Sequence, residues 1–226
     1  MAVGLATVGA AAETLPLPAN LIGLGSDTGE RLLIESTARQ AYWPLSMQFV
    51  TQKNQAYCGV ATLVMVLNAL EVPAPPLPGI ELFTTFTQDN VLNDTTEPIL
   101  PQADLLRQGM TLDQFARLLQ LHGVRAEVHH AATGAMARFR ASAVRYLSLP
   151  RHHVVVNYLR RALGQEKGGH LSPLAAYDEK TDRFLILDVS RYKYPPVWVT
   201  TEDLFAAMNT VDADNADQTR GFVLIE

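Results

Sequence analysis

The apolar run at residues 59–70 constrains the fold of this chain more than any other feature. Its apolar residues recur at helical spacing, and alanines and valines fill the positions between them. The pattern predicts a helix that is buried nearly all round, so the rest of the chain must pack around it. Cys58, the only cysteine, falls in the first turn of that helix. Unpaired amide N–H groups and the helix dipole favour a thiolate there, and the thiolate is the attacking form of cysteine.

Position alone leaves two interpretations of Cys58 open. A lone cysteine is more often a small buried hydrophobic residue than a nucleophile. It cannot form an internal disulfide, and it cannot supply the cysteine pairs of a structural zinc site. The choice therefore depends on residues elsewhere in the chain.

Composition excludes several classes of protein. Of 226 residues, 48% are hydrophobic and 18% are charged, which is enough apolar material for a sizeable core. No linker or low-complexity segment divides the chain, so we expect one domain over residues 15–226. The net charge of −5 and the lack of a basic run argue against nucleic acid or an anionic membrane as a partner. No stretch reaches the roughly 20 apolar residues of a transmembrane helix.

Residues 1–14 differ from the rest of the chain. They are rich in small apolar residues, and three alanines before Glu13 resemble a secretory cleavage site, although the basic start of such a signal is missing. We expect this segment to be a disordered leader or the remnant of a signal peptide. Cleavage of a signal would place the protein in the periplasm or outside the cell, and otherwise it would be cytoplasmic.

The other segments predict an α+β fold, with helices first and an antiparallel sheet afterwards. A capping box at Thr111 and Gln114 marks the clearest helix. We expect further structure as follows: helices at residues 30–42, 111–123, 134–147 and 201–208, and strands at residues 124–130, 152–159, 171–177, 183–189 and 221–225. The four prolines of residues 72–79 predict an extended connection, and residues 83–100 are expected to form a loop.

The hairpin of residues 171–189 is predicted to bring His170 and Asp188 together. In a symmetric register centred on residue 179, the two lie directly opposite each other. Opposed residues share a face with Cβ atoms about 5 Å apart, so the carboxylate can hold an imidazole N–H. A one-residue bulge would undo this register. Asp188 also lies in an apolar run, where a carboxylate is costly to bury unless it is paired.

The remaining histidines do not suggest a metal site. Neighbours in a strand point to opposite faces, so neither His129 with His130 nor His152 with His153 is expected to share a metal ion. His122 ends a predicted helix, where it favours the helix dipole. His170 differs because two glycines precede it and allow backbone or ligand to approach closely.

Four residues together fit a thiol acyltransferase or protease. An imidazole oriented by a carboxylate keeps the sulfur ionised and later protonates the leaving amine. A glutamine upstream of the nucleophile can donate its amide N–H, with the backbone N–H of the cysteine, to the oxyanion of the tetrahedral intermediate. These roles fall on Cys58, His170, Asp188 and Gln52.

Three longer motifs resemble phytochelatin synthase, in its short bacterial form. They are QKNQAYCGVATLVMVLNAL, VNYLRRALGQEKGGHLSPLAAYDEKTDRFLILDVSRYKYPPVWV, and MNTVD followed by TRGF. The resemblance extends from Leu15 to the end of the chain. It implies a papain-like fold in which an N-terminal helical part carries the nucleophile and a C-terminal antiparallel sheet carries the histidine and aspartate. It also implies attack on the Cys–Gly bond of glutathione, release of glycine and a γ-glutamylcysteinyl thioester on the enzyme.

The resemblance implies roles for eight residues. The catalytic set agrees with the residues derived above: Cys58 as nucleophile, His170 as base, Asp188 as orienting acid and Gln52 as oxyanion donor. The substrate-binding set comprises Asn157 and Gly169 lining the acyl pocket, with Asp212 and Arg220 holding the γ-glutamyl end. An arginine can fork onto the α-carboxylate of that group, and an aspartate can meet its α-ammonium.

From the resemblance we expect hydrolysis of glutathione to γ-glutamylcysteine and glycine as the main reaction. Transfer to a second glutathione, which gives phytochelatin, is expected to be weaker and to depend on a metal–thiolate acceptor. No tightly bound cofactor is implied, and an ion such as Cd or Zn would enter as its glutathione thiolate. The plant-type form has a further cysteine-rich region, whereas this sequence has no second cysteine, so we expect no metal sensing by cysteines. A homodimer stays open.

Two other functions compete with this interpretation. A papain-like peptidase that cleaves double-glycine leaders also places a glutamine before Cys-Gly and uses a later histidine and aspartate. A non-catalytic thiol or metal–thiolate binding protein would use the same pocket without turnover. Cleavage of a leader peptide would identify the first, and absence of glycine release would identify the second.

Overall fold

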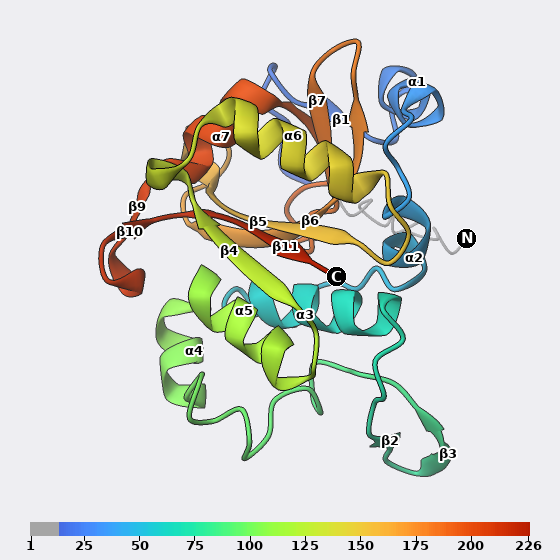
Figure 1. Cartoon of the computed structure of the whole chain (residues 1–226), viewed down its shortest axis with the longest axis vertical. Coiled ribbons are helices and arrows are strands. Elements are labelled where there is room, and N and C mark those ends of the chain that lie inside the picture. Colours follow the sequence, from blue (N-terminus) through green and yellow to red (C-terminus); the bar gives the residue numbers. More distant parts are fainter. Residues whose placement is uncertain (1–13) are drawn as a thin grey trace, which may run out of the picture.

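The computed structural model describes residues 14–226 as a mixed fold of helices around one large antiparallel sheet (Figure 1). Each strand of this sheet runs antiparallel to its neighbours. From edge to edge the strands are β1 (Ile22–Gly23), β8 (Val197–Thr200), β7 (Arg183–Ile186), β6 (Gly169–Asp178), β5 (His153–Leu159), β11 (Gly221–Ile225) and β4 (Ala126–His130). The leader was expected at residues 1–14, and its residues 1–13 lie outside the described residues.

Helices cover both faces of the sheet (Figure 1). α6 (Met136–Leu147) and α7 (Thr201–Met208) pack on one face. α3 (Cys58–Ala69) and α5 (Leu112–Leu121) pack on the other face, and α4 (Gln102–Gln108) lies beyond them. The central strand β5 is therefore buried on both sides, as its run of valines predicted.

The predicted central helix is confirmed as α3. Its residues from Cys58 to Leu67 are all buried, so it packs on every side rather than along one stripe. No side chain caps its first turn, where Tyr57 is the N-cap residue. The first-turn amide groups next to Cys58 thus lack the partner that a capping side chain would provide.

Several predicted elements match the structure closely. The capping box of α5 is present in both directions, since Thr111 accepts from the Gln114 amide and the Gln114 side chain accepts from the Thr111 amide. Gly123 then follows with φ of +76°, a conformation that glycine adopts without strain. α7 and β11 have the predicted bounds, and β4, β5 and α6 begin within two residues of the predicted starts.

The prediction of one helix at residues 30–42 is wrong. The helix α1 covers Asp27–Glu35 and starts at Ser26, whose hydroxyl caps the Gly29 amide. It ends because the Ser36 hydroxyl donates to the Leu32 carbonyl and the chain becomes extended there. A separate helix, α2 (Tyr42–Met47), follows, with a proline in its first turn, where a missing N–H costs no hydrogen bond.

The β2–β3 hairpin and the helix α4 were also not predicted. Residues 83–100 were expected to form a loop, but their first two residues belong to β3 (Ile80–Thr84), which pairs with β2 (Pro76–Leu77) in a projecting hairpin (Figure 1). All five residues of β3 are exposed, so no burial pattern marked it. The helix α4 is short and has one buried residue, Leu105, which leaves too weak a periodic signal to recognise.

Candidate active site

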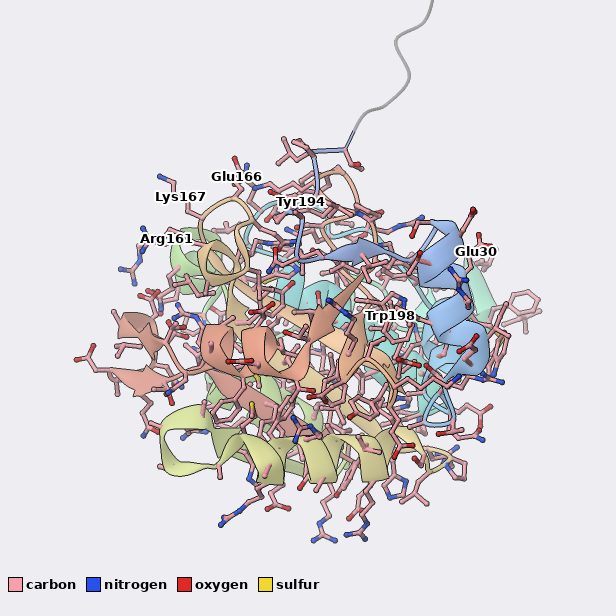
Figure 2. The ribbon with its side chains drawn as sticks, turned by 90° about the horizontal axis from the view of Figure 1, so that it is seen from above. Glu30, Arg161, Glu166, Lys167, Tyr194 and Trp198 are labelled. Carbon is pink, nitrogen blue, oxygen red and sulfur yellow. The ribbon has the colours of Figure 1, made fainter. Side chains whose placement is uncertain are left out.

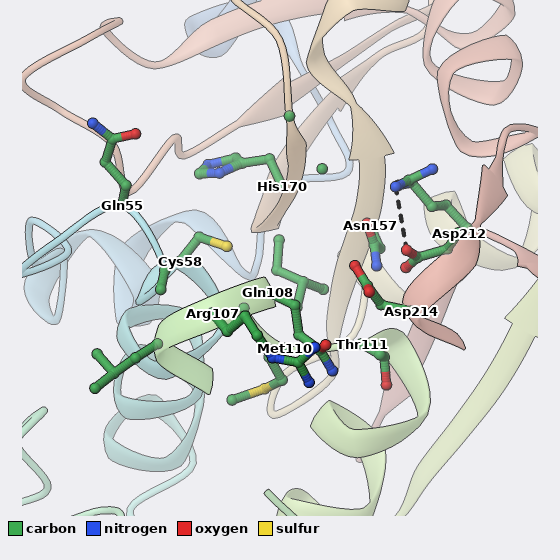
Figure 3. Close-up of a pocket in the computed structure, with 17 residues that line it drawn as sticks. Gln55, Cys58, Arg107, Gln108, Met110, Thr111, Asn157, His170, Asp212 and Asp214 are labelled. Carbon is green, nitrogen blue, oxygen red and sulfur yellow. Dashed lines mark hydrogen bonds and ion pairs between the residues drawn. The ribbon is translucent and has the colours of Figure 1, made fainter. Parts of the chain in front are cut away.

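Cys58 lies at the start of α3, on the wall of a cavity of about 290 Å³ (Figure 3). The helix approaches β6 closely here, because a Cβ on Gly59 would fall 3.1 Å from the Leu171 side chain and 2.8 Å from Met110 Sδ. One turn later, the Thr62 hydroxyl donates to the Leu171 carbonyl at 3.1 Å. These contacts hold the sulfur-bearing end of the helix against the strand that carries His170.

His170 and Asp188 do meet, although the predicted register is wrong. The hairpin pairs Asp178 with Arg183 and Leu174 with Ile186, and its register shifts between Leu174 and Ala176. Leu187 N–H then donates to the Pro173 carbonyl, so continued pairing would set Asp188 opposite Ser172 rather than His170. The imidazole and carboxylate thus meet along a diagonal, with His170 Nε2 donating to Asp188 Oδ1 at 2.9 Å.

Asp188 is completely buried, and one of its oxygens makes three contacts. Oδ1 accepts from His170 Nε2, from Arg160 Nη2 at 2.7 Å and from the Ser190 amide at 2.8 Å. Burial by itself would raise the pKa of this carboxyl. The charges and hydrogen bonds of His170 and Arg160 outweigh burial and hold the pKa well below its usual range. Asp188 is therefore ionised at neutral pH.

Cys58 and His170 line the same end of the cavity (Figure 3), and each shifts the pKa of the other. The ring nitrogen Nε2 faces Asp188 and lies 3.0 Å from the Ser172 hydroxyl, so Nδ1 is the nitrogen left for the sulfur. Burial raises the pKa of the thiol, but the neighbouring His170 and its charge outweigh burial and lower the pKa below its usual value. Burial and the Arg160 charge lower the pKa of His170. Asp188 and Cys58 raise it by a larger amount, so the net shift of this pKa is upward. Both shifts favour a thiolate–imidazolium pair.

Gln52 is buried close to this group, but it does not line the cavity. Its Oε1 accepts from the Ser190 hydroxyl at 2.6 Å. Its Nε2 donates to the Asn54 carbonyl at 2.6 Å and to the Tyr192 hydroxyl at 3.1 Å, which occupies both amide hydrogens. Its role as an oxyanion donor stays a prediction, and it would require one of these two bonds to be exchanged.

The four residues expected to bind substrate all line the cavity. Arg220 Nη2 donates to Asp212 Oδ1 at 3.3 Å, and Nη1 bonds the Val211 carbonyl at 2.5 Å. A Cβ on Gly169 would fall 3.2 Å from the Arg220 guanidinium, so a side chain at this position would push the guanidinium by a few tenths of an ångström. Asn157 completes the group (Figure 3).

The cavity has two chemically different ends. Figure 3 shows Cys58 and His170 at one end, and Asp212 and Asp214 toward the other. Arg220 forms an ion pair with Asp212, whereas Asp214 adds a second carboxylate to the same wall. Opposite charges next to each other suit a ligand group that carries both an ammonium and a carboxylate.

Sequence reasoning missed several residues of the site. Arg160 and Ser172 contact the Asp188–His170 pair, and a wall of the cavity comes from the end of α4 and its connection to α5, residues 107–111. A usable signal existed for Arg160, because an arginine directly after a buried strand requires a carboxylate partner. No comparable signal marked the wall at residues 107–111, since α4 was not recognised.

The remaining histidines lie apart from this site. His129 stacks on Phe222 with ring centroids 4.8 Å apart, and His130 contacts Asp113 and the Thr219 carbonyl. Within residues 14–226, no cluster of three or more His, Cys, Asp or Glu side chains could hold a metal ion. In the same part of the chain, none of the helices is both long enough and apolar enough to cross a membrane.

Comparison with known proteins identifies relatives. Residues 12–222 match the family model described as phytochelatin synthase. Glutathione gamma-glutamylcysteinyltransferase 3 of Lotus japonicus is 33% identical over 98% of this chain and 45% of its own length. The glutathione gamma-glutamylcysteinyltransferase of Schizosaccharomyces pombe is 31% identical over 90% of this chain and 47% of its own. This chain therefore spans about half the length of the curated relatives that it matches.

One solved structure also shows a similarity. It is a double glycine motif protease from an AMS/PCAT transporter, in complex with the leader peptide. The match covers 77% of this chain and 86% of that one, at 13% identity and a TM-score of 0.34. A similarity of that size carries no argument about the fold or activity of this chain.

Proposed function

The chain belongs to the phytochelatin synthase family, and we propose that it is a thiol enzyme acting on glutathione, of the glutathione gamma-glutamylcysteinyltransferase type. In this proposal the α+β domain is papain-like, with the nucleophile on a helix and its partners on the sheet. One observation carries the proposal. The Cys58 thiol and the His170 imidazole, which Asp188 orients, lie on one cavity with the Asp212–Arg220 pair.

The first half of the reaction is acyl transfer to Cys58. The thiolate attacks the carbonyl carbon of the cysteine residue in glutathione, and the developing oxyanion is met by the Cys58 amide N–H and, in this proposal, by Gln52. The His170 imidazolium donates its proton to the nitrogen of the leaving glycine. The products are free glycine and a γ-glutamylcysteinyl thioester on Cys58.

The second half removes the acyl group. With water as the acceptor, neutral His170 takes a proton, and γ-glutamylcysteine leaves while the thiol of Cys58 is restored. With the α-amine of a second glutathione as the acceptor, a new peptide bond forms and gives phytochelatin. We propose hydrolysis as the main path, and a Cd or Zn ion enters the transfer path only as part of a glutathione–thiolate substrate.

The charged end of the cavity supports glutathione as the substrate class. A γ-glutamyl group carries its α-ammonium and α-carboxylate on one carbon atom. In the proposal Arg220 binds the carboxylate, Asp212 binds the ammonium, and Asn157 and Gly169 line the wall between this end and Cys58. A double-glycine leader peptide has no such zwitterionic group at the equivalent place.

The first test is mass spectrometry of the intact protein after brief mixing with glutathione. We expect an increase by the mass of one γ-glutamylcysteinyl group, together with release of free glycine. Cys58→Ala should show neither. The α-linked peptide Glu-Cys-Gly is the matched substrate control, and we expect it to be cleaved much more slowly.

Four outcomes would count against the proposal. If no acyl group and no glycine appeared, the enzyme would not act on glutathione. If Cys58→Ala released glycine at the native rate, the thioester would be wrong. Equal cleavage of the α-linked peptide, or preferential cleavage of a double-glycine leader, would remove the assignment of Asp212 and Arg220 to a γ-glutamyl group.

A further inference from the structure

Arg160 is a buried cation that contacts the candidate active site without lining its cavity. It directly follows β5, opens a short 3-10 helix at Arg160–Leu163 and is only 3% exposed. Its Nη2 donates to Asp188 Oδ1 at 2.7 Å, and its Nη1 donates to Gln165 Oε1 at 2.8 Å. The guanidinium also lies over the ring of Tyr194, 5.3 Å from the centroid. Its charge thus has one carboxylate partner and is shielded from water.

Counting charges shows why such a cation matters. When Cys58 is a thiolate and His170 an imidazolium, these two groups cancel, and the ionised Asp188 leaves one negative charge. All three side chains are buried, so this excess charge would lie in a medium where an unpaired charge is costly. Arg160 supplies the missing positive charge at hydrogen-bond distance from Asp188.

We propose that Arg160 is a positioning residue whose buried guanidinium balances the Asp188 carboxylate, so that Asp188 stays ionised beside His170 and the Cys58 thiolate can form in this buried site without excess negative charge. The proposal rests on the proposed function only for the assignment of Cys58 and His170 as the reacting pair. Arg160 contacts neither the cavity nor the sulfur directly, and it acts through Asp188.

The hydrogen bonds at Asp188 also fix the orientation of its carboxylate. Within the described part of the chain, Asp188 Oδ2 has no hydrogen-bond partner, so His170 and Arg160 share the same oxygen. Arg160 is in turn held by Gln165 and Tyr194. The carboxylate therefore keeps the orientation in which Oδ1 faces the imidazole.

The electrostatic effect has a definite sign. Burial has the largest influence on both reacting groups, raising the pKa of Cys58 and lowering that of His170. The charge of Arg160 lowers the pKa of both. Without that charge, the thiol would ionise at higher pH and the imidazolium would persist to higher pH. Both limbs of a pH profile should therefore move upward together.

Few other ionisable groups face this cluster. Tyr158, on β5, meets the His170 ring edge-on at 5.6 Å, and burial raises the pKa of its hydroxyl, so it stays neutral. Beyond Tyr194, Glu166 and Lys193 form an ion pair at 2.6 Å near the surface. Figure 2 shows Glu166 and Arg161 at the outer edge of the molecule.

The sole cysteine of the chain makes the test direct. The rate of alkylation of Cys58 by iodoacetamide, followed by intact mass from pH 4 to pH 10, reads the thiolate without any glutathione. This readout separates the two proposals, because it stays valid even if glutathione is not the substrate. Arg160→Met removes the charge and keeps most of the stem, and Arg161→Met removes the same charge from the exposed neighbouring position.

We expect the midpoint of the alkylation profile to rise by about one unit in Arg160→Met, so that below the native midpoint this variant is alkylated about tenfold more slowly than the native chain. Arg161→Met should match the native chain. Arg160→Lys, which keeps a positive charge, should recover most of the rate. The kcat profile for glutathione, if glutathione is cleaved, should shift upward on both limbs in Arg160→Met.

The double variant Arg160→Met with Asp188→Asn distinguishes charge balance from simple packing. It removes one charge of each sign, so we expect its alkylation midpoint to return to within about 0.3 units of the native value, although kcat falls because Asp188 is lost. This variant also serves if Arg160→Met alone does not fold. A native profile for Arg160→Met would overturn the proposal. A double variant that alkylates as slowly as Arg160→Met, or that does not fold, would overturn it as well.

Discussion

At the scale of single residues, His153 is a buried base that the candidate site does not use. It is fully buried on β5, and neither of its ring nitrogens has a hydrogen-bond partner in the described part of the chain. Burial, and to a smaller extent the charges of His152 and Arg151, lower its pKa to about 4. In the unfolded chain the same histidine binds a proton near pH 6.5. Stability should therefore fall as the pH falls from about 6.5 to about 4.

His153→Leu should remove this acid sensitivity. Between pH 7 and pH 4.5, we expect the native chain to lose about 2–3 kcal/mol more of its free energy of unfolding than the variant does. Urea unfolding at the two pH values measures this difference. His152→Gln, at the partly exposed neighbouring position, should keep most of the native acid sensitivity, because burial has the largest influence on the pKa of His153. Parallel losses in native chain and His153→Leu would show that His153 is not the titrating group.

Gln52 makes a second prediction at the residue scale. If its amide donates to the oxyanion, Gln52→Ala should lower kcat by about 10²–10³-fold with little change in KM. Tyr192→Phe should keep activity, because it frees one hydrogen of the same amide. Gln55→Ala, at an exposed position on the cavity wall, is the matched control and should have little effect on kcat. Steady-state kinetics decide the matter, and a nearly native kcat in Gln52→Ala would exclude the role.

At the scale of elements, the β6–β7 hairpin brings His170 and Asp188 into the predicted contact, although its register differs from the predicted symmetric one. The shift near residue 175 moves the pairing by one residue, and the strand ends at Ile186. Asp188 then lies outside the strand, just before a bend at Val189, and its carboxylate accepts a hydrogen bond from the Ser190 amide at 2.8 Å. The side chain thus reaches back to His170 from a loop, a geometry that a symmetric hairpin does not contain.

The packing of α1 gives a prediction at this scale. Alanine is normally about 1 kcal/mol more favourable than glycine inside a helix. At Gly29, however, a Cβ would fall 2.0 Å from the Gly23 carbonyl oxygen, and Gly23 is held in place by the pairing of β1 with β8. We expect Gly29→Ala to lower the free energy of unfolding by about 1–3 kcal/mol.

Thr28→Ala is the control for that variant, because it changes the exposed neighbouring position of the same helix turn. We expect it to stay within about 0.5 kcal/mol of the native chain in denaturant unfolding. A Gly29→Ala chain as stable as Thr28→Ala would mean that α1 can shift away from β1.

At the scale of the whole molecule, Asp182 joins three elements on the far side of the sheet from Cys58. It lies in the hairpin turn with φ of +51°. Its carboxylate accepts from Arg140 of α6, from the Tyr177 hydroxyl of β6 and from the Thr201 hydroxyl at the start of α7. One side chain therefore ties the helix layer of this face to the sheet.

Asp182→Ala should lower the free energy of unfolding by about 2 kcal/mol, since three donors lose a partly exposed acceptor. Glu179→Ala, in the same turn and exposed, should change it little. Thermal or urea unfolding measures the difference. Alkylation of Cys58 should stay native in both variants, and a changed alkylation rate in Asp182→Ala would show that this layer is coupled to the site.

The sequence alone determined those features that depend on neighbours a few residues apart. The apolar period of residues 59–70 fixed α3 and the place of Cys58 in its first turn, and the Thr111–Gln114 capping box fixed the start of α5. The contact of His170 with Asp188 was also predicted, because a buried carboxylate needs a partner and these residues lie on one hairpin.

Only the tertiary structure decided what depends on distant residues. Three features have no periodic pattern in the sequence that would predict them. They are the register shift in the hairpin, the bonds that occupy the Gln52 amide, and the contact of Arg160 with Asp188, 28 residues away. The physical reason is one of range. Helix periods and caps act within one or two turns, whereas a buried charge is satisfied by whichever group the completed fold brings to it.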